Sequence, residues 1–234
     1  MRARAIGGFF ASALPVGLRG LAVQSARELV YRKRHIQGVF KSRRYRGLRG
    51  LRLHLGCGHN LKSGWVNVDL NPAADLTLDV RERLPFDDES FSMIYSEHFY
   101  EHFAYPDAIT HLLSECFRIL EPGGIHLFAV PDGERVLRHY VTRAYDDHAE
   151  AQLRFNPAWC KTQMDHVNYC LRQNGEHQWY YDEETMRMLL ESIGFVKIRR
   201  RDFDPALDQE YRRVGTMYIE CSKAEPAVAL TPER

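Results

Sequence analysis

The chain has 234 residues, 44% hydrophobic and 27% charged, which suits one folded domain with an extension and argues against a disordered protein. Its net charge of +1 hides an asymmetry, because residues 1–50 hold twelve Arg/Lys against the single acid Glu28, whereas residues 51–234 hold 20 basic and 30 acidic residues. No apolar run reaches the roughly 18 residues of a membrane-spanning helix, which argues against an integral membrane protein.

Residues 1–46 are predicted to form a basic, helical N-terminal extension, with helix-compatible sequence over residues 16–46. Its apolar residues recur at near-helical spacing: Leu18, Leu21, Ala22 and Leu29. One interpretation is a basic amphipathic helix that lies on an anionic membrane. Another is a helix that packs on the domain with its basic face in solvent. A cleavable targeting segment over residues 1–24 is a third.

From residue 51 onward, short strands alternate with helices. Strands are predicted at 51–55, 65–70, 75–80, 91–96, 125–130, 196–203 and 216–223. A helix is predicted at 106–120, and a second one follows Asp182 as N-cap and ends before Gly194. This alternation predicts a Rossmann-like α/β fold, with a mostly parallel sheet and helices on both faces.

Two segments fall outside this alternation. Residues 132–180 are rich in aromatic, His and Arg residues and are predicted to be an irregular insertion, or lid, over an acceptor site. Residues 224–234 carry Pro226 and Pro232 and are predicted to be a flexible tail.

The cysteines indicate reduced thiols in a cytoplasmic compartment, because their number is odd and no C-x-x-C pair occurs. They are Cys57, Cys116, Cys160, Cys170 and Cys221. The spacing of Cys160, His166 and Cys170 fits no common zinc pattern, so no metal is predicted.

Small and acidic residues follow the carboxyl ends of four predicted strands, where open α/β sheets bind ligands. These residues are Gly56 and Gly58, Asp69, Asp79, and the run Ser96-Glu97-His98. Glycine lets backbone N–H groups meet a ligand, a carboxylate such as Asp69 suits two ribose hydroxyls, and Asp79 suits an adenine amino group. The sequence GCGHNL has Leu61 where a dinucleotide motif has its third glycine, and the next strand starts by Trp65. A ligand with ribose and adenine but no diphosphate is therefore favoured.

Five segments resemble the class I S-adenosylmethionine-dependent methyltransferases, in particular their type 11-like bacterial subgroup. They are LHLGCG, GWVNVDL, LPFDDESFSMIYSEHFYEH, ECFRILEPGGIHLFAVPD and GEHQWYYDEETMRMLLESIGF. The resemblance covers about residues 50–223 and implies a methyltransferase domain at 47–223, with seven strands of which the last is antiparallel. It also implies S-adenosylmethionine as cofactor. The donor site that it implies comprises Leu55, Gly56, Cys57, Gly58, Asn60, Asp69, Leu70, Asp79, Val80, Ser96 and Glu97. The missing third glycine and the absent first helix leave the methionine-carboxylate contacts unassigned.

The run SEHFYEH places His98, Glu101 and His102 at i, i+3 and i+4, so on a helical turn they share one face. These three are the predicted catalytic residues, because a hydroxyl acceptor must lose its proton and an imidazole suits that task. For Glu101 and His102 the alternative is that they anchor the loop by hydrogen bonds. The same string reads H-x-x-E-H, the inverted zinc-peptidase motif, with Glu176 as a conceivable third ligand. Its place after a buried strand of the donor layout opposes that interpretation.

The acceptor site is predicted to contain aromatic residues and histidines from the 132–180 region. The predicted substrate-binding residues are His98, Tyr140, His177, Trp179 and Tyr181. A packed lid or a solvated face is the alternative for the residues of this region.

The predicted function is methyl transfer to a small-molecule or glycan acceptor, such as a sugar hydroxyl in surface-polysaccharide biosynthesis. The predicted location is the cytoplasm, with peripheral contact to an anionic membrane through residues 1–46. No nucleic-acid partner is predicted, because the body is acidic and no D-P-P-Y or N-P-P-Y motif occurs. A non-catalytic adenosyl-ligand-binding scaffold and an H-x-x-E-H zinc metallopeptidase are the alternatives.

Overall fold

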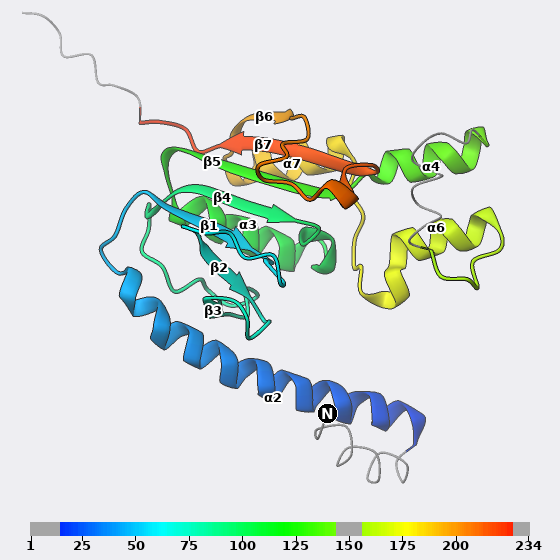
Figure 1. The fold of residues 1–234 in the computed structure, drawn as a ribbon, viewed down its shortest axis with the longest axis horizontal. Coiled ribbons are helices and arrows are strands. Elements are labelled where there is room, and N and C mark those ends of the chain that lie inside the picture. Colours follow the sequence, from blue (N-terminus) through cyan, green and yellow to red (C-terminus); the bar gives the residue numbers. More distant parts are fainter. Residues whose placement is uncertain (1–14, 144–155, 227–234) are drawn as a thin grey trace, which may run out of the picture.

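A computed structural model describes residues 15–143 and 156–226, and a seven-stranded sheet forms its centre (Figure 1). The strands are β1 (Leu51–Leu55), β2 (Val66–Asp69), β3 (Leu76–Thr77), β4 (Phe91–Glu97), β5 (Leu120–Pro131), β6 (Val196–Arg200) and β7 (Thr216–Ser222). Their order is β3-β2-β1-β4-β5-β7-β6, and β7 runs antiparallel to both of its neighbours. The predicted mostly parallel sheet with an antiparallel last strand is confirmed.

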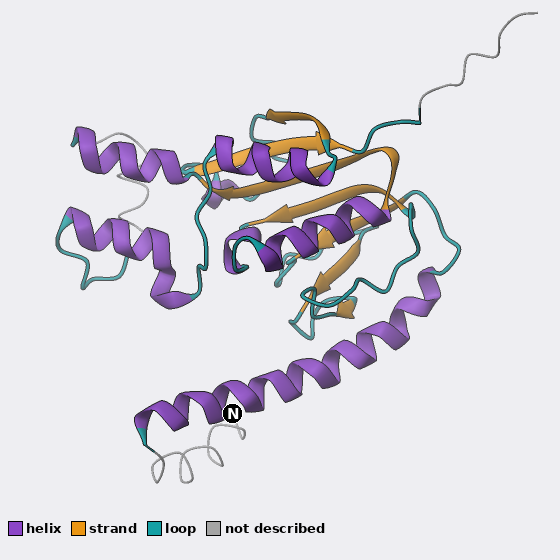
Figure 2. Cartoon of the chain, turned by 180° about the vertical axis from the view of Figure 1, so that it is seen from behind, coloured by secondary structure: helices purple, strands orange, loops and turns teal. Residues whose placement is uncertain are grey.

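Two amphipathic helices, α3 (Asp107–Ile119) and α7 (Glu183–Ile193), cover one face of this sheet (Figure 2). The apolar stripe of α3 packs into the core through Ile109, Leu112, Leu113, Cys116 and Ile119. The caps predicted for α7 are present, because the Asp182 carboxylate accepts from the Thr185 N–H and Gly194 adopts a left-handed φ of 112°. All five cysteines are free and buried.

Helices were predicted on both faces, but in the described residues the opposite face of the sheet is covered mainly by the segments 56–65 and 201–213 (Figure 1). Lys62 Nζ donates to the Leu207 carbonyl at 2.6 Å, and the Tyr95 hydroxyl lies 3.1 Å from Asp208 Oδ1. Asp208 in turn pairs with Arg201 at 2.6 Å. As predicted, residues 56–65 hold no crossover helix before β2. Loops therefore cover this face of the sheet through polar contacts.

The region 132–180 contains helices, so the prediction of an irregular segment is wrong for its described part. Helix α4 (Gly133–Thr142) starts at Asp132, whose side chain accepts from the Arg135 N–H, and α6 (Gln163–Arg172) starts with a capping box at Thr162. Both helices lie beyond the carboxyl ends of the strands (Figure 1). Their buried side chains are few, with Val136 in α4 and Cys170 in α6.

Helix α2 (Val16–Ser42) confirms the predicted helix of the basic extension and lies along the β3 edge of the sheet (Figure 1). Its C-terminal half is docked there, because the Thr77 hydroxyl donates to the Arg34 carbonyl at 3.2 Å and Gly38 packs on the Thr77 backbone. Side chains over residues 17–27 are exposed. The N-terminal half of α2 thus projects past the domain.

Within the described residues, no helix combines the length and the apolar character that crossing a membrane demands. The targeting interpretation falls largely on residues 1–14, and most of the predicted tail is 227–234; both stretches lie outside the described residues, as do residues 144–155 of the predicted insertion.

Candidate functional site

The turn after β1 presents backbone where the ligand loop is predicted. Gly56 and Gly58 have φ values of 66° and 53°, a left-handed conformation that disfavours other residues. A Cβ at Gly56 would also clash with the ring of Phe99, whereas the space around Gly58 is open. The Asn60 N–H donates to the Cys57 carbonyl at 2.8 Å and closes the turn over the buried residues Leu55 and Cys57.

The carboxylate of Asp69 joins this turn to the end of β2. Its Oδ2 accepts from the Gly58 N–H at 2.8 Å, and its Oδ1 accepts from the Asn71 N–H at 2.7 Å. A charged acceptor with two backbone donors is fixed in orientation, which is what binding a ribose diol requires. The structure thus brings Gly58 and Asp69 into direct contact, although they are eleven residues apart.

The residues predicted around the adenine contact α2. Asp79 accepts from Arg81 Nε at 2.9 Å, and Arg81 also pairs with Glu28 of α2 at 2.7 Å. Burial alone would raise the pKa of Asp79, but the hydrogen bonds from Arg81 hold it below its ordinary value. Arg34 donates to the Leu70 carbonyl at 2.9 Å, and Val80 is buried.

Two predicted donor residues at the end of β4 differ in their surroundings. Ser96 is buried, and its Oγ has no hydrogen-bond partner among the described residues. Glu97 is also buried, but its carboxylate accepts from the Gln209 N–H at 3.0 Å and from Gln209 Nε2 at 2.6 Å. Side-chain-free backbone at the glycine turn and the oriented Asp69 carboxylate are compatible with S-adenosylmethionine. The individual donor contacts stay predictions.

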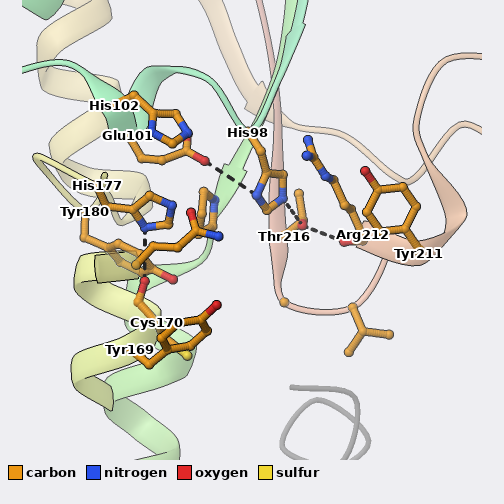
Figure 3. A pocket seen from close by; sticks show the side chains of 14 residues that line it. His98, Glu101, His102, Tyr169, Cys170, His177, Tyr180, Tyr211, Arg212 and Thr216 are labelled. Carbon is orange, nitrogen blue, oxygen red and sulfur yellow. Dashed lines mark hydrogen bonds and ion pairs between the residues drawn. The ribbon is translucent and has the colours of Figure 1, made fainter. Parts of the chain in front are cut away.

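A cavity of about 230 Å³ opens at the carboxyl ends of β4 and β5, between these strands, α6 and the 211–216 segment (Figure 3). Its lining is rich in imidazole and phenol groups: His98, Glu101, His102, Tyr169, Cys170, His177, Tyr180, Tyr211, Arg212 and Thr216. The cavity therefore gathers all three predicted catalytic residues.

His98 is held in one orientation and one tautomer. Its φ is 50°, a left-handed conformation that is uncommon for a non-glycine residue. The Thr216 hydroxyl donates to the Arg212 carbonyl at 2.6 Å, so it accepts from His98 Nε2–H at 2.8 Å. The other ring nitrogen, Nδ1, then carries a lone pair and faces Glu101 Oε1 at 3.5 Å. Burial lowers the pKa of His98 well below its ordinary value.

Glu101 is fully buried, and neither carboxylate oxygen has a hydrogen-bond partner among the described residues. Burial raises its pKa to about 8. Its backbone carbonyl accepts from the Gln178 N–H at 2.7 Å, which ties the 176–181 segment to the end of β4.

The prediction that His98, Glu101 and His102 share a helical face is wrong in detail. Only Tyr100–His102 form a helical turn, a 3₁₀-helix, and His98 precedes it. Tyr100 and Phe103 turn into the core, which bends this segment away from a regular helix. The three predicted catalytic residues still meet, because the cavity brings them together. An inverted zinc-peptidase motif places both histidines on one helix, which this segment does not form.

Of the predicted substrate residues, His98 and His177 line the cavity and the other three do not. Trp179 stacks on Tyr105 with ring centroids 4.6 Å apart, and Tyr140 lies against the Arg143 guanidinium. Tyr181 is buried in the hydrophobic core.

Most of the other lining residues were not predicted from the sequence, among them Tyr169, Tyr211, Arg212 and Thr216. Arg212 and Thr216 belong to a connection before β7 that carries no local pattern. They reach the cavity only because the antiparallel β7 starts beside the end of β5, as the pairing of Thr216 with Pro131 shows.

The fold, with its glycine turn after β1, its carboxylate at the end of β2 and its antiparallel β7, defines the class I S-adenosylmethionine-dependent methyltransferases. A family model described as "Methyltransferase domain" matches residues 49–199, and the chain belongs to this family. The protein is thus an S-adenosylmethionine-dependent methyltransferase. No curated protein gives a significant match to the sequence.

Solved structures with a similar chain path are distant in sequence. A SAM-dependent methyltransferase from Archaeoglobus fulgidus is 18% identical, with 84% of this chain and 94% of that chain covered and a TM-score of 0.47. A second one, from Methanosarcina mazei, is 16% identical, with 79% and 97% covered and a TM-score of 0.46. A Haemonchus contortus phosphoethanolamine N-methyltransferase, solved with phosphomonomethylethanolamine and S-adenosylhomocysteine, is 14% identical, with 81% and 52% covered and a TM-score of 0.44.

Proposed function

We propose that the protein transfers the methyl group of S-adenosylmethionine to a hydroxyl group of a small-molecule or glycan acceptor. The acceptor occupies the cavity lined by His98, His177 and Tyr180. The observation that carries this proposal is the position of the cavity, which opens at the end of β4, where Ser96 and Glu97 close the predicted donor site. Rings such as Tyr169, Tyr180 and Tyr211 suit the faces of a sugar. A sugar acceptor supports a role in surface-polysaccharide biosynthesis.

The chemistry asks for positioning and for the removal of one proton. The sulfonium of the donor supplies an electrophilic methyl group, and holding the acceptor oxygen in line with it contributes much of the rate. An O–C bond forms as the C–S bond breaks, and the hydroxyl proton leaves. His98 Nδ1 is a suitable acceptor for that proton, because Thr216 engages the other ring nitrogen as donor.

The test is transfer of label from methyl-labelled S-adenosylmethionine to fractionated cell extract. The wild type should label a small-molecule or glycan fraction, and His98→Ala should lower the rate by about 100-fold, since general bases contribute 10²–10⁴-fold. His111→Ala, an exposed histidine on α3, serves as the matched control and should retain the full rate. Donor binding without a labelled product in any fraction would favour the non-catalytic scaffold, and label confined to nucleic acid would refute the proposed acceptor class.

We also propose that α2 rests on an anionic membrane. Leu18, Leu29, Ile36 and Phe40 fall on one face of the helix, opposite its docked side, and Leu29 and Phe40 are 73% and 67% exposed. The flanking residues of the extension are basic, with one acid in residues 1–50. An apolar stripe between cations complements the negatively charged surface of such a membrane.

Co-sedimentation of the full chain with vesicles tests this contact. Vesicles rich in phosphatidylglycerol should bind the wild type, and the double variant Leu29→Glu/Phe40→Glu should bind at least about 10-fold more weakly, since each burial of a large apolar side chain contributes about 1.5–3 kcal/mol. Val30→Glu places the same charge beside the stripe and should bind nearly as well as the wild type. Equal binding of the double variant, or binding to neutral vesicles alone, would contradict the proposal.

A further inference from the structure

We propose that Glu101, His102 and His177 bind a divalent transition-metal ion, of the Zn²⁺ type, in the wall of the cavity. Each of these residues offers one ligand atom, and the three atoms lie within 4.8 Å of one another. All three line the same cavity, and Figure 3 shows His102 and His177 beside the Glu101 carboxylate. The rings of His102 and His177 meet edge to face, with centroids 5.1 Å apart.

Backbone carbonyls fix both imidazoles in the tautomer that a metal needs. His102 Nδ1 lies 3.1 Å from the Glu176 carbonyl, and His177 Nδ1 lies 3.1 Å from the Cys170 carbonyl. A carbonyl only accepts, so each Nδ1 carries the hydrogen and each Nε2 keeps its lone pair. Metal-binding histidines almost always have such a partner on their second nitrogen. Two neighbouring histidines with this arrangement form a preorganised pair of donors.

The third donor is the buried carboxyl group of Glu101. Both of its oxygens are buried without a hydrogen bond from the described residues, and isolated carboxylates are costly to bury. One ionisable contact of this group is His98 Nδ1 at 3.5 Å, which carries a lone pair. A cation placed between the carboxylate and the two Nε2 lone pairs would satisfy them together.

Binding a metal requires the three side chains to draw closer together. Ligand atoms about 2.0–2.2 Å from a tetrahedral metal lie about 3.4 Å apart, whereas the ligand atoms of Glu101, His102 and His177 lie within 4.8 Å of one another. The set of two imidazoles and a carboxylate favours Zn²⁺ or its neighbours over Mg²⁺ and Ca²⁺, which prefer oxygen ligands. His98 is adjacent but is not a ligand, because its Nδ1 takes the acceptor proton, and the fourth position stays open for the acceptor hydroxyl.

This site differs from the inverted peptidase motif. In that motif the two histidines of H-x-x-E-H are ligands and the glutamate is the general base. Here Glu101 is a ligand, and the second imidazole comes from His177, about 75 residues downstream. The consequence for catalysis rests on the proposed function: a cation in the acceptor cavity would orient an acceptor hydroxyl and lower its pKa.

Titration of the full-length, tag-free, chelator-treated protein with Co²⁺ tests the site without donor or acceptor. We expect one Co²⁺ per chain with visible d–d absorption that Zn²⁺ abolishes. Glu101→Gln keeps the buried volume and should weaken Co²⁺ binding at least about 100-fold, as should His177→Ala, because even outer partners of a metal site contribute 10–100-fold. His102→Ala, at an exposed position, should do the same with little risk to folding.

Three control variants separate the alternatives. His111→Ala and Cys170→Ser should bind Co²⁺ as the wild type does, which removes surface histidines and the nearby thiol as sources. Asp69→Ala should also bind Co²⁺ as the wild type does. The Co²⁺ titration therefore tests the metal site independently of whether Asp69 belongs to the donor site. Absence of d–d absorption, or unchanged affinity in both Glu101→Gln and His177→Ala, would overturn the proposal. Binding that depends on His98 and His102 but not on Glu101 would indicate the peptidase arrangement instead.

Discussion

Replacing Asp69 by alanine is expected to weaken S-adenosylmethionine binding by at least about 100-fold, because each hydrogen bond to a charged group contributes about 1.5–3 kcal/mol and a ribose offers two. The variant also removes the acceptor that orients Gly58 and Asn71, so the glycine turn loses its link to β2. Titration calorimetry of the purified protein with the donor measures the change directly.

Two companion variants sharpen the Asp69 experiment. Asp69→Asn keeps the shape of the side chain and part of its hydrogen bonding. Its affinity for S-adenosylmethionine should lie between those of the wild type and Asp69→Ala. Asp87→Ala removes an exposed carboxylate that accepts from the Gly47 N–H, and donor affinity should stay the same. An Asp69→Ala protein that is folded and binds the donor normally would show that the donor site lies elsewhere.

Acidification from pH 7 to pH 5 is expected to destabilise the protein through His126, which is fully buried on β5. Burial lowers the pKa of His126 to about 3, against 6.5 for an ordinary histidine. Above pH 6.5 the imidazole of His126 is neutral in both the folded and the unfolded chain. Below it the unfolded chain binds a proton that the folded chain refuses, so stability falls until about pH 3. At 1.36 kcal/mol per pKa unit, this group alone lowers the unfolding free energy by about 2 kcal/mol at pH 5.

The variant His126→Gln isolates that contribution. Glutamine does not titrate and can keep the 2.7 Å hydrogen bond that His126 Nε2 shares with the Tyr100 hydroxyl. Urea unfolding at pH 7 and pH 5 should show a loss about 2 kcal/mol smaller in His126→Gln than in the wild type, whatever its stability at pH 7. His111→Ala should lose as much unfolding free energy between pH 7 and pH 5 as the wild type does. Equal losses in His126→Gln and the wild type would show that His126 titrates normally.

The sheet was predictable from the sequence because its signals are local. Strand β1 is a short apolar run before a glycine turn, and Asp182 and Gly194 mark the ends of α7 by their own chemistry. The methyltransferase class followed from segments that keep their order along the chain. Helices α4 and α6 were not predicted, although Asp132 and the Thr162 capping box mark where they begin, because the aromatic, His and Arg residues of this region also suit an irregular lid.

The cavity was less predictable because it depends on tertiary structure. His98 and Glu101 were predicted, but their relative position was not. It depends on the left-handed backbone of His98 before the 3₁₀ turn, so the shared helical face that was expected does not form. Thr216 fixes the tautomer of His98 from 118 residues away, a contact that exists only after β7 pairs with β5. Trp179 is a residue type that is common in binding sites, yet its ring stacks on Tyr105 outside the cavity.

Arg81 holds Glu28 of α2 and Asp79 of the predicted adenine site at the same time, which makes the two surfaces thermodynamically linked. A partner that binds the projecting half of α2 and moves Glu28 would change the strength of the ion pair between Arg81 and Asp79. That change would alter the affinity of the proposed donor site. Reciprocity then requires the donor to change the affinity of α2 for its partner by the same factor. If α2 rests on a membrane as proposed, the helix would then also act as an effector input, and occupation of the proposed donor site would change how tightly α2 binds that membrane.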